Sequence, residues 1–81
     1  MKVQVRLGSG LSRLAGSSQF ALELERGATV GDLLTNLEHR YPSLAAGIDR
    51  ALPVVAGSHV AHDRALEDGE EIALLFPAAG G

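Results

Sequence analysis

The first residues of the chain alternate between polar and apolar side chains. The run from Lys2 to Leu7 has this period of two, which predicts a β-strand with one apolar face. A second alternating run follows, with its apolar face at Phe20, Leu22 and Leu24. Because only a short connection separates the two strands, we expect them to pair in antiparallel fashion.

Residues 8–16 form that connection. Gly8-Ser9-Gly10 is expected to interrupt the first strand. These glycines do not predict a phosphate-binding loop, because the lysine and the helix start of such a loop are missing. Leu11 and Leu14, in the stretch that follows, are candidates for burial.

A helix is predicted to begin at Thr29. The Thr29 hydroxyl can accept a hydrogen bond from the backbone N–H of Asp32, and a carboxylate at that position suits the positive end of the helix dipole. Apolar residues then follow at spacings of three and four, at Val30, Leu33, Leu34 and Leu37. The helix should end at Tyr41, because the residue before a proline is disfavoured in a helix.

The next twenty residues give weaker signals. Leu44, Ile48 and Leu52 have helical spacing, but their segment is too short to assign. Residues 54–56 predict a brief strand, and Gly57-Ser58 predicts a two-residue turn into a second short strand at residues 59–61. A loop is expected from Asp63 to Gly69.

The last predicted strand runs from Glu70 to Phe76, and Pro77 ends it because proline cannot donate to a strand ladder. One face of this strand carries Ile72, Leu74 and Phe76, and the other carries Ala73 and Leu75. Leu75 should therefore point away from the helix. Two interpretations stay open: Leu75 is exposed as a contact for a partner, or the chain's own loops cover it.

The order of these elements predicts an α+β fold. The first and last strands could pair in the centre of a mixed sheet of four to five strands, with one main helix packed on one face. That arrangement is the β-grasp, or ubiquitin-like, architecture. Residues 1–76 are predicted to form this domain and residues 77–81 a flexible C-terminal tail.

Composition narrows the classes of function. The 81 residues fit a single domain, and the absence of cysteine excludes thiol nucleophiles and thiolate metal sites. The net charge is −3 and the seven basic residues form no run, so no nucleic-acid partner is expected. No apolar stretch approaches the length of a membrane span or of a signal-peptide core. A cytoplasmic location is expected.

Two groups of side chains invite a site assignment. His59, His62 and Asp63 could suggest a metal, but residues three apart on a strand point to opposite faces, and surface histidines are the better account. The acidic residues at 67, 68, 70 and 71 could suggest a pair of catalytic carboxylates. A solvated acidic turn that helps to dock a basic partner is the better account.

The C-terminal Gly80-Gly81 is the most informative feature. Folding gives no reason for it, because glycine carries the largest entropic cost when it is ordered. A pair of glycines instead offers a slim segment whose carboxylate can enter a narrow active site. Ala78 and Ala79 keep the preceding positions narrow as well.

Three stretches together resemble the MoaD/ThiS family of ubiquitin-like sulfur-carrier proteins, and within it most closely the molybdopterin-synthase small subunits. These stretches are residues 65–81 (ALEDGEEIALLFPAAGG), residues 11–16 (LSRLAG) and residues 28–34 (ATVGDLL). The chain departs from the family pattern in four places. Gly8-Ser9-Gly10 replaces an aromatic-aromatic-Ala run, Val55-Ala56-Gly57 replaces Val-Asn-Gly, Leu74-Leu75 replaces aromatic residues, and Phe76 takes the first position of a Pro-Pro pair.

The resemblance implies a mechanism for the C-terminus. The Gly81 carboxylate would be adenylated and then converted to a thiocarboxylate that donates its sulfur. Gly80, Ala79 and Ala78 would enter the partner's active site, and Leu75, Phe76 and Pro77 would contact the partner. The chain itself would be a non-catalytic, sulfur-donating subunit that binds no cofactor or metal; the ATP would be used by the activating enzyme.

The resemblance also implies the partners. They are an E1-like adenylating enzyme of the MoeB/ThiF type, a molybdopterin-synthase large subunit of the MoaE type, and a sulfur donor such as a cysteine desulfurase or a rhodanese. Three alternatives stay open. The chain could carry sulfur for another product (thiamine, cysteine, a thiolated tRNA base or a secondary metabolite), it could be a protein modifier joined to lysines through Gly81, or it could be an interaction domain with an inert tail.

Overall fold

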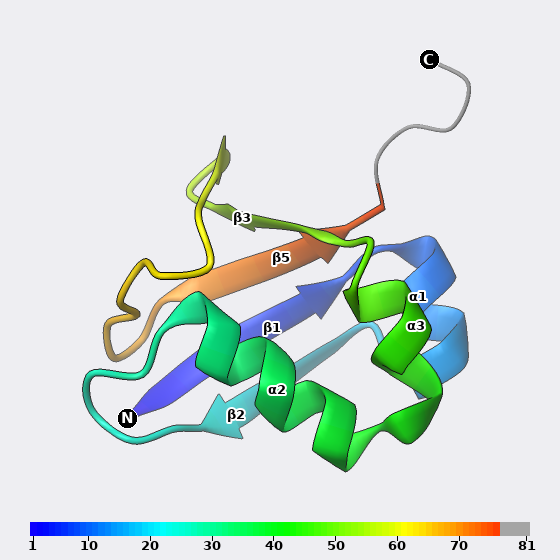
Figure 1. Cartoon of the computed structure of the whole chain (residues 1–81), viewed down its shortest axis with the longest axis horizontal. Coiled ribbons are helices and arrows are strands. Elements are labelled where there is room, and N and C mark those ends of the chain that lie inside the picture. Colours follow the sequence, from blue (N-terminus) through cyan, green and yellow to red (C-terminus); the bar gives the residue numbers. More distant parts are fainter. Residues whose placement is uncertain (77–81) are drawn as a thin grey trace.

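The computed structural model describes residues 1–76, and the predicted tail, residues 77–81, lies outside the described residues. The strands are β1 (Lys2–Leu7), β2 (Gln19–Glu23), β3 (Leu52–Val55), β4 (Ser58–His59) and β5 (Glu71–Leu75). The helices are α1 (Ser9–Ala15), α2 (Val30–Arg40), the single 3₁₀ turn η1 (Pro42–Leu44) and α3 (Ala45–Ile48). Figure 1 shows their arrangement.

The described strands form one mixed sheet in the order β2-β1-β5-β3-β4. The first and last strands, β1 and β5, are parallel neighbours in its centre, with Val5 opposite Ile72. Strand β2 pairs with β1 in antiparallel fashion, and β3 pairs likewise with β5 and with β4. The predictions of the central pair and of the antiparallel first pair are both confirmed.

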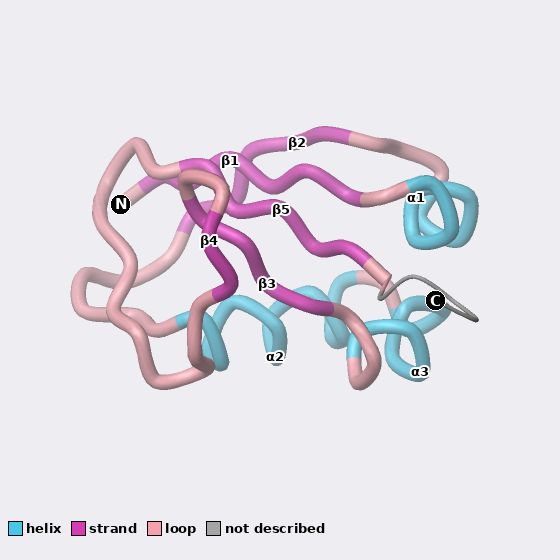
Figure 2. The backbone as a smooth tube through the Cα atoms, turned by 90° about the horizontal axis from the view of Figure 1, so that it is seen from above, coloured by secondary structure: helices cyan, strands magenta, loops and turns pink. Residues whose placement is uncertain are grey.

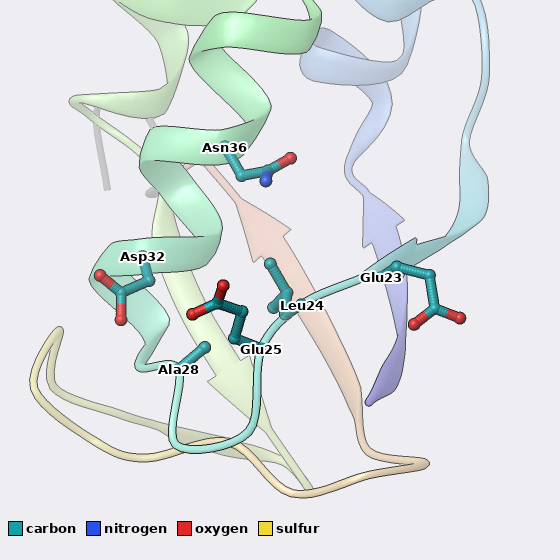
Figure 3. A pocket seen from close by; sticks show the side chains of 6 residues that line it. All are labelled: Glu23, Leu24, Glu25, Ala28, Asp32 and Asn36. Carbon is teal, nitrogen blue, oxygen red and sulfur yellow. The ribbon is translucent and has the colours of Figure 1, made fainter.

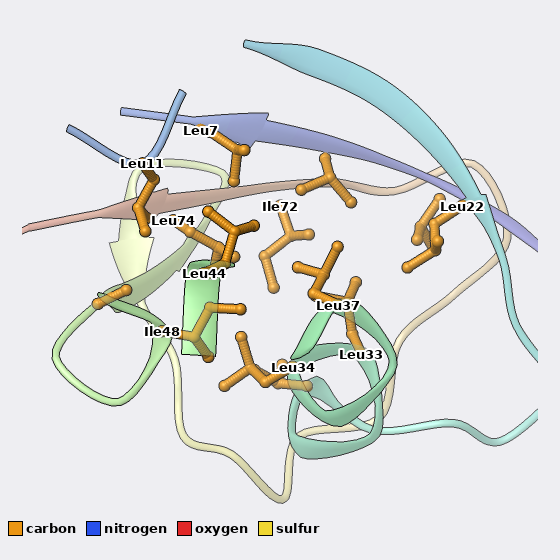
Figure 4. Close-up of a cluster of buried hydrophobic side chains, with 14 of the residues drawn as sticks. Leu7, Leu11, Leu22, Leu33, Leu34, Leu37, Leu44, Ile48, Ile72 and Leu74 are labelled. Atoms are coloured by element: carbon orange, nitrogen blue, oxygen red, sulfur yellow. The ribbon is translucent and has the colours of Figure 1, made fainter. Parts of the chain in front are cut away.

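Helices α2 and α3 cover one face of the sheet (Figure 2). Between the helices and the sheet lies one cluster of buried apolar side chains (Figure 4), which includes Leu7, Leu11, Leu22, Leu33, Leu34, Leu37, Leu44, Ile48, Ile72 and Leu74. In β1 and β5, every second residue points into this cluster, as the period of two requires. We call the other face of the sheet the open face; it carries Gln4, Arg6, Leu52, Val54, Ala73 and Leu75.

The start of α2 is held by a reciprocal cap. The Thr29 hydroxyl accepts a hydrogen bond from Asp32 N at 3.2 Å, and Asp32 Oδ2 accepts one from Thr29 N at 2.9 Å. These two bonds satisfy backbone donors that have no partner within the helix. The predicted helix start, its buried stripe and its end before Pro42 are all confirmed.

The connection between β1 and β2 differs from the prediction. It contains the helix α1, which begins directly after Gly8 and ends where Gly16 adopts a left-handed conformation with φ 79°. Leu11 is buried, as predicted, but Leu14 is 50% exposed. The expectation for Leu14 was wrong because this short helix lies at the end of the sheet and reaches the core only through Leu11.

The hairpin between β3 and β4 turns one residue earlier than predicted. Its central residues are Ala56 (φ 51°) and Gly57 (φ 80°), not Gly57 and Ser58. A two-residue turn with positive φ at both positions matches the right-handed twist of the strands it joins. Strand β4 is consequently shorter, and earlier in the chain, than residues 59–61.

The segment with ambiguous helical spacing divides into two structures. Leu44 and Ile48 belong to η1 and α3 and are buried, whereas Leu52 starts β3 and lies on the open face. Within residues 1–76, no helix is long and apolar enough to cross a membrane.

Candidate functional site

The C-terminal end of β5 presents an exposed pair of leucines. Leu75 is the last residue of the strand and lies directly opposite Leu52 of β3. Because β5 directs Ile72 and Leu74 into the core, Leu75 points to the open face, where it is 39% exposed; Leu52 is 36% exposed. The prediction that Leu75 points outward is confirmed. The partner contact assigned to it stays a prediction.

The open face changes character along β5. Near Leu75 its lining is apolar and comes from Ala73 and from Val54 of the neighbouring strand. Towards the start of β5, Arg6 Nη2 lies 3.6 Å from Glu71 Oε1, and both side chains are about half exposed. An apolar area beside a pair of charges is suited to a protein partner, because the apolar part supplies burial and the charges supply orientation.

Phe76, the next residue, turns back towards the helices. A methyl carbon placed on Gly10 of α1 would lie 2.6 Å from Cε2 and 2.8 Å from Cδ2 of the Phe76 ring. The ring therefore lies directly against the backbone of Gly10, although 40% of Phe76 remains exposed. The sequence predicted only a strand break at Gly8-Ser9-Gly10 and did not reveal this contact.

The acidic residues after Leu66 hold the loop before β5 in place. Asp68 Oδ1 accepts a hydrogen bond from Lys2 N at 2.7 Å, and both carboxylate oxygens of Glu70 accept from Arg64. The Arg64 guanidinium holds the pKa of the Glu70 carboxyl below its ordinary value. The prediction of a solvated acidic turn is therefore wrong for Glu70, whose charge is paired within the fold.

The histidines do not gather into a binding site in the described part of the chain. His59 lies exposed at the end of β4, and His62 lies exposed in the loop that follows. Among residues 1–76, no three His, Cys, Asp or Glu side chains lie close enough together to hold a metal ion.

A hollow at the opposite end of the sheet carries three carboxylates (Figure 3). Its lining is Glu23, Leu24, Glu25, Ala28, Asp32 and Asn36. Glu23 pairs with Lys2 at the start of β1, whereas Leu74 and Leu75 lie beside the end of that strand. The Asp32 carboxylate already caps α2, and the other two acids, Glu23 and Glu25, are exposed. The hollow therefore gives no basis for a functional assignment.

The remaining predicted site residues are Pro77, Ala78, Ala79, Gly80 and Gly81, and all five lie outside the described residues. The structure therefore places two members of the predicted site, Leu75 and Phe76. Leu75 lies next to Leu52, and Phe76 lies next to Gly10. Neither Leu52 nor Gly10 was among the site residues predicted from the sequence.

Comparison with known proteins gives a family match over most of the chain. A model of the ThiS family matches residues 5–81 and so includes both Leu75 and the C-terminal glycines. Among curated proteins, none is a significant match to the chain.

Solved structures agree on the fold. The chain is 28% identical to SAMP1 from Haloferax volcanii (TM-score 0.89, 100% of both chains covered). It is 26% identical to a protein assigned as molybdopterin converting factor subunit 1 from Pyrococcus furiosus (TM-score 0.88, covering 96% of this chain and 99% of that one). A chain in the complex of subunits 1 and 2 of the molybdopterin-converting factor from Helicobacter pylori is 21% identical over the full length of both (TM-score 0.75), which shows the fold alone. The architecture is the predicted ubiquitin-like β-grasp.

Proposed function

The chain belongs to the ThiS family, and on that premise we propose that it carries sulfur as a thiocarboxylate on Gly81. The observation that carries the proposal is the exposed Leu52–Leu75 pair. Leu75 comes six residues before Gly81 in the sequence. A partner that binds these leucines would have the C-terminal glycines within reach.

The chemistry follows from the weakness of a carboxylate as an electrophile. An oxygen of the Gly81 carboxylate attacks the α-phosphorus of ATP and releases pyrophosphate. The terminal sulfur of a persulfide on the sulfur donor then attacks the acyl carbon, the C–O bond to AMP breaks, and an acyl disulfide forms through the new C–S bond. A cysteine thiolate of the activating enzyme or of the donor attacks the donor-side sulfur of this S–S bond, which leaves the thiocarboxylate on Gly81 and a disulfide on the enzymes. The resulting thiocarboxylate is a good nucleophile at neutral pH because its sulfur is already ionised. An activating enzyme of the E1-like type supplies the ATP site, and a cysteine desulfurase or rhodanese supplies the sulfur.

For the acceptor, we propose molybdopterin synthesis, with this chain as the small subunit beside a large subunit of the MoaE type. The similarity to the Pyrococcus furiosus protein, over nearly all of both chains, supports this assignment. The open face near Leu75 would bind the large subunit, with Phe76 and Pro77 at the edge of the contact, and the segment from Ala78 to Gly81 would enter its active site.

A second candidate is a protein modifier that forms an isopeptide bond through Gly81. The similarity to SAMP1, a small archaeal modifier protein, supports this alternative, because it is comparable in identity and covers the whole of both chains. Both candidates use the same first step, adenylation of Gly81, and differ only in the nucleophile that follows.

The intact mass of the protein isolated from its own cells tests the proposal. A mass increased by the exchange of one oxygen for one sulfur would place a thiocarboxylate on the chain and support the sulfur carrier. Conjugates of higher mass that disappear when Gly81 is deleted would support the modifier. If the cells contain neither product, and a cell extract with ATP produces neither, both candidates are wrong.

Co-purification with a large subunit separates the acceptors. A stable complex with a MoaE-type protein that is lost in a Leu75→Ser variant would support molybdopterin synthesis. A thiocarboxylated protein that forms no such complex would instead indicate another sulfur acceptor.

A further inference from the structure

Two glycines from different helices lie against one aromatic ring at the end of the described chain. Besides its approach to Gly10, the Phe76 ring lies close to Gly47 of α3, where an added methyl carbon would be 3.1 Å from Cζ. We call the surface formed by Gly10 and Gly47 the two-glycine surface. Side chains at these positions would occupy the place of the ring.

Both glycines are unfavourable choices for local structure. Gly10 and Gly47 lie within helical segments, where glycine is less stable than alanine because its backbone loses more freedom on folding. Neither has the positive φ that would demand a glycine. The contact with Phe76 gives a physical reason for glycine at Gly10, while at Gly47 a methyl group would also come within 2.8 Å of Leu11 Cδ2.

This contact lies one residue beyond the sheet. Strand β5 ends at Leu75, which still pairs with Leu52 across the ladder. Phe76 rests on α1 and α3 instead, so the ordered packing of the domain continues up to the residue bonded to Pro77.

We propose that Phe76 is a positioning residue: its ring, held on the two-glycine surface, sets the point on the domain from which residues 77–81 are presented to the enzyme that acts on Gly81. This inference rests on the proposed function. Residues 77–81 carry the chain from this point to the reactive carboxylate, and five residues span at most about 18 Å. A shift of the starting point therefore shifts the whole region that Gly81 can reach.

The role differs from that of Leu75. A partner that binds the open face gains affinity from Leu75, so loss of Leu75 raises KM. The Phe76 ring instead determines whether Gly81 meets the nucleotide once the complex has formed, so loss of its placement lowers the maximal rate. The two residues are adjacent in the chain, but they face different sides of the sheet and act on different kinetic constants.

The test measures activation of Gly81 directly. Purified protein is incubated with an extract of its source cells, ATP and hydroxylamine, whose nitrogen attacks the acyl carbon of the Gly81 adenylate and displaces AMP. The hydroxamate product is quantified by intact mass. The dependence of its initial rate of formation on the concentration of the purified protein gives a maximal rate and a KM. The variants are Phe76→Ala, Gly10→Ala and the double variant, with Leu14→Ala, an exposed site on the same helix as Gly10, as the control.

We expect Phe76→Ala and Gly10→Ala each to lower the maximal rate about five- to ten-fold while KM stays within about two-fold. The double variant should be no slower than Phe76→Ala alone, because a methyl group on Gly10 has no ring left to displace. Leu14→Ala should keep the wild-type rate. A rise in KM at unchanged maximal rate would show that Phe76 contributes affinity for the activating enzyme and does not position Gly81, and would overturn the inference, as would no kinetic effect at all.

Thermal unfolding and nuclear Overhauser effects test the contact without any partner. Gly10→Ala should lower Tm in the wild-type background and raise it in the Phe76→Ala background, where only the better helix propensity of alanine remains. Overhauser effects between the Phe76 ring and the Gly10 α-protons should be present in the wild type, and their absence would overturn the inference.

The kinetic outcomes distinguish failure of the proposed function from failure of the positioning role. If the wild-type protein forms no hydroxamate, both the proposed function and the positioning role are refuted. A wild type that reacts while the variants match it refutes the positioning role alone.

Discussion

Arg64 and Glu70 form a two-pronged ion pair across the loop that leads into β5. Arg64 Nη1 donates to Glu70 Oε1 at 2.9 Å, and Nη2 donates to Oε2 at 2.8 Å. Glu70 Oε1 also accepts from the backbone N of Glu67 at 2.9 Å. The loop is thus held by three bonds to one carboxylate directly before the strand that completes the centre of the sheet.

We expect Glu70→Gln to lower Tm by about 4 °C at pH 7, because the fold loses a partly covered, bidentate ion pair. Arg64 lowers the pKa of Glu70 in the folded state, so the pair stabilises the fold above the ordinary carboxyl pKa of 4.5, and this contribution is lost as the pH falls through the lowered pKa. The difference in Tm between wild type and variant should therefore shrink in acid. Thermal unfolding from pH 7 to pH 3 measures it.

Glu71→Gln is the matched control for this prediction. Glu71 is the next residue, and its ion pair with Arg6 is longer and more exposed, so its loss should change Tm by less than about 1 °C. Equal effects of the two substitutions at pH 7 would contradict the special role of the Arg64–Glu70 pair.

Removal of the cap on α2 should destabilise the whole domain. Thr29→Ala deprives the Asp32 backbone N–H of its acceptor, and we expect a loss of about 1 kcal/mol in the free energy of unfolding. Thr35→Ala changes an exposed threonine on the same helix and should be close to neutral. Urea unfolding of both variants provides the measurement, and similar midpoints would contradict a capping role.

The turn between β3 and β4 leaves room for a stabilising substitution. Ala56 has a positive φ of 51°, which strains a residue with a Cβ, whereas asparagine tolerates this conformation better. Ala56→Asn should raise Tm by about 3–5 °C. Gly57→Ala, at φ 80°, should lower it. A lower Tm for Ala56→Asn would show that the turn has a different conformation in solution.

Leu75→Ser should separate binding from folding. Because Leu75 is already substantially exposed, we expect little change in Tm but about a ten-fold loss in kcat/KM for Gly81 activation, mainly through KM. Leu14→Ser removes a leucine that is even more exposed, on α1, and should retain the wild-type kinetics. Identical kinetics for both variants would exclude the open face near Leu75 as the docking surface.

Deletion of Gly81 should abolish activation and leave Tm unchanged. The buried cluster of the described chain lies between Val3 and Leu74, so no loss of core packing is expected from the change. Addition of one residue after Gly81 should have the same effect, since the reactive carboxylate is displaced. A fall in Tm by several degrees on deletion would contradict a purely chemical role for Gly81.

The elements that depend on local pattern were predictable from the sequence. The Thr29–Asp32 cap and the apolar stripe of α2 are encoded within a dozen residues, and strict alternation marks β1. The outward position of Leu75 followed from the same alternation. Central pairing of the first and last strands required an argument from the order of elements, and it also proved right.

The misses have physical causes. Helix α1 was not predicted because glycines at positions 8 and 10 have low helix propensity and the helix has only seven residues, so packing of Leu11 outweighs propensity there. The hairpin turn was predicted one residue too late, because alanine is uncommon at a positive φ and Ala56 was therefore assigned to the strand. The contact of Gly10 with Phe76 joins two departures from the family pattern that lie far apart in the chain, and no local period reveals such a pair.

The position of β5 between β1 and β3 ties synthesis of the protein to its folding. Without β5, the described sheet would divide into two separate pairs of strands, β1 with β2 and β3 with β4, because β5 joins them. The sheet can therefore close only after β5 has left the ribosome. Leu75 reaches its place beside Leu52 in that same step, so an enzyme that recognises the two leucines together would select molecules in which β5 is already paired with β3.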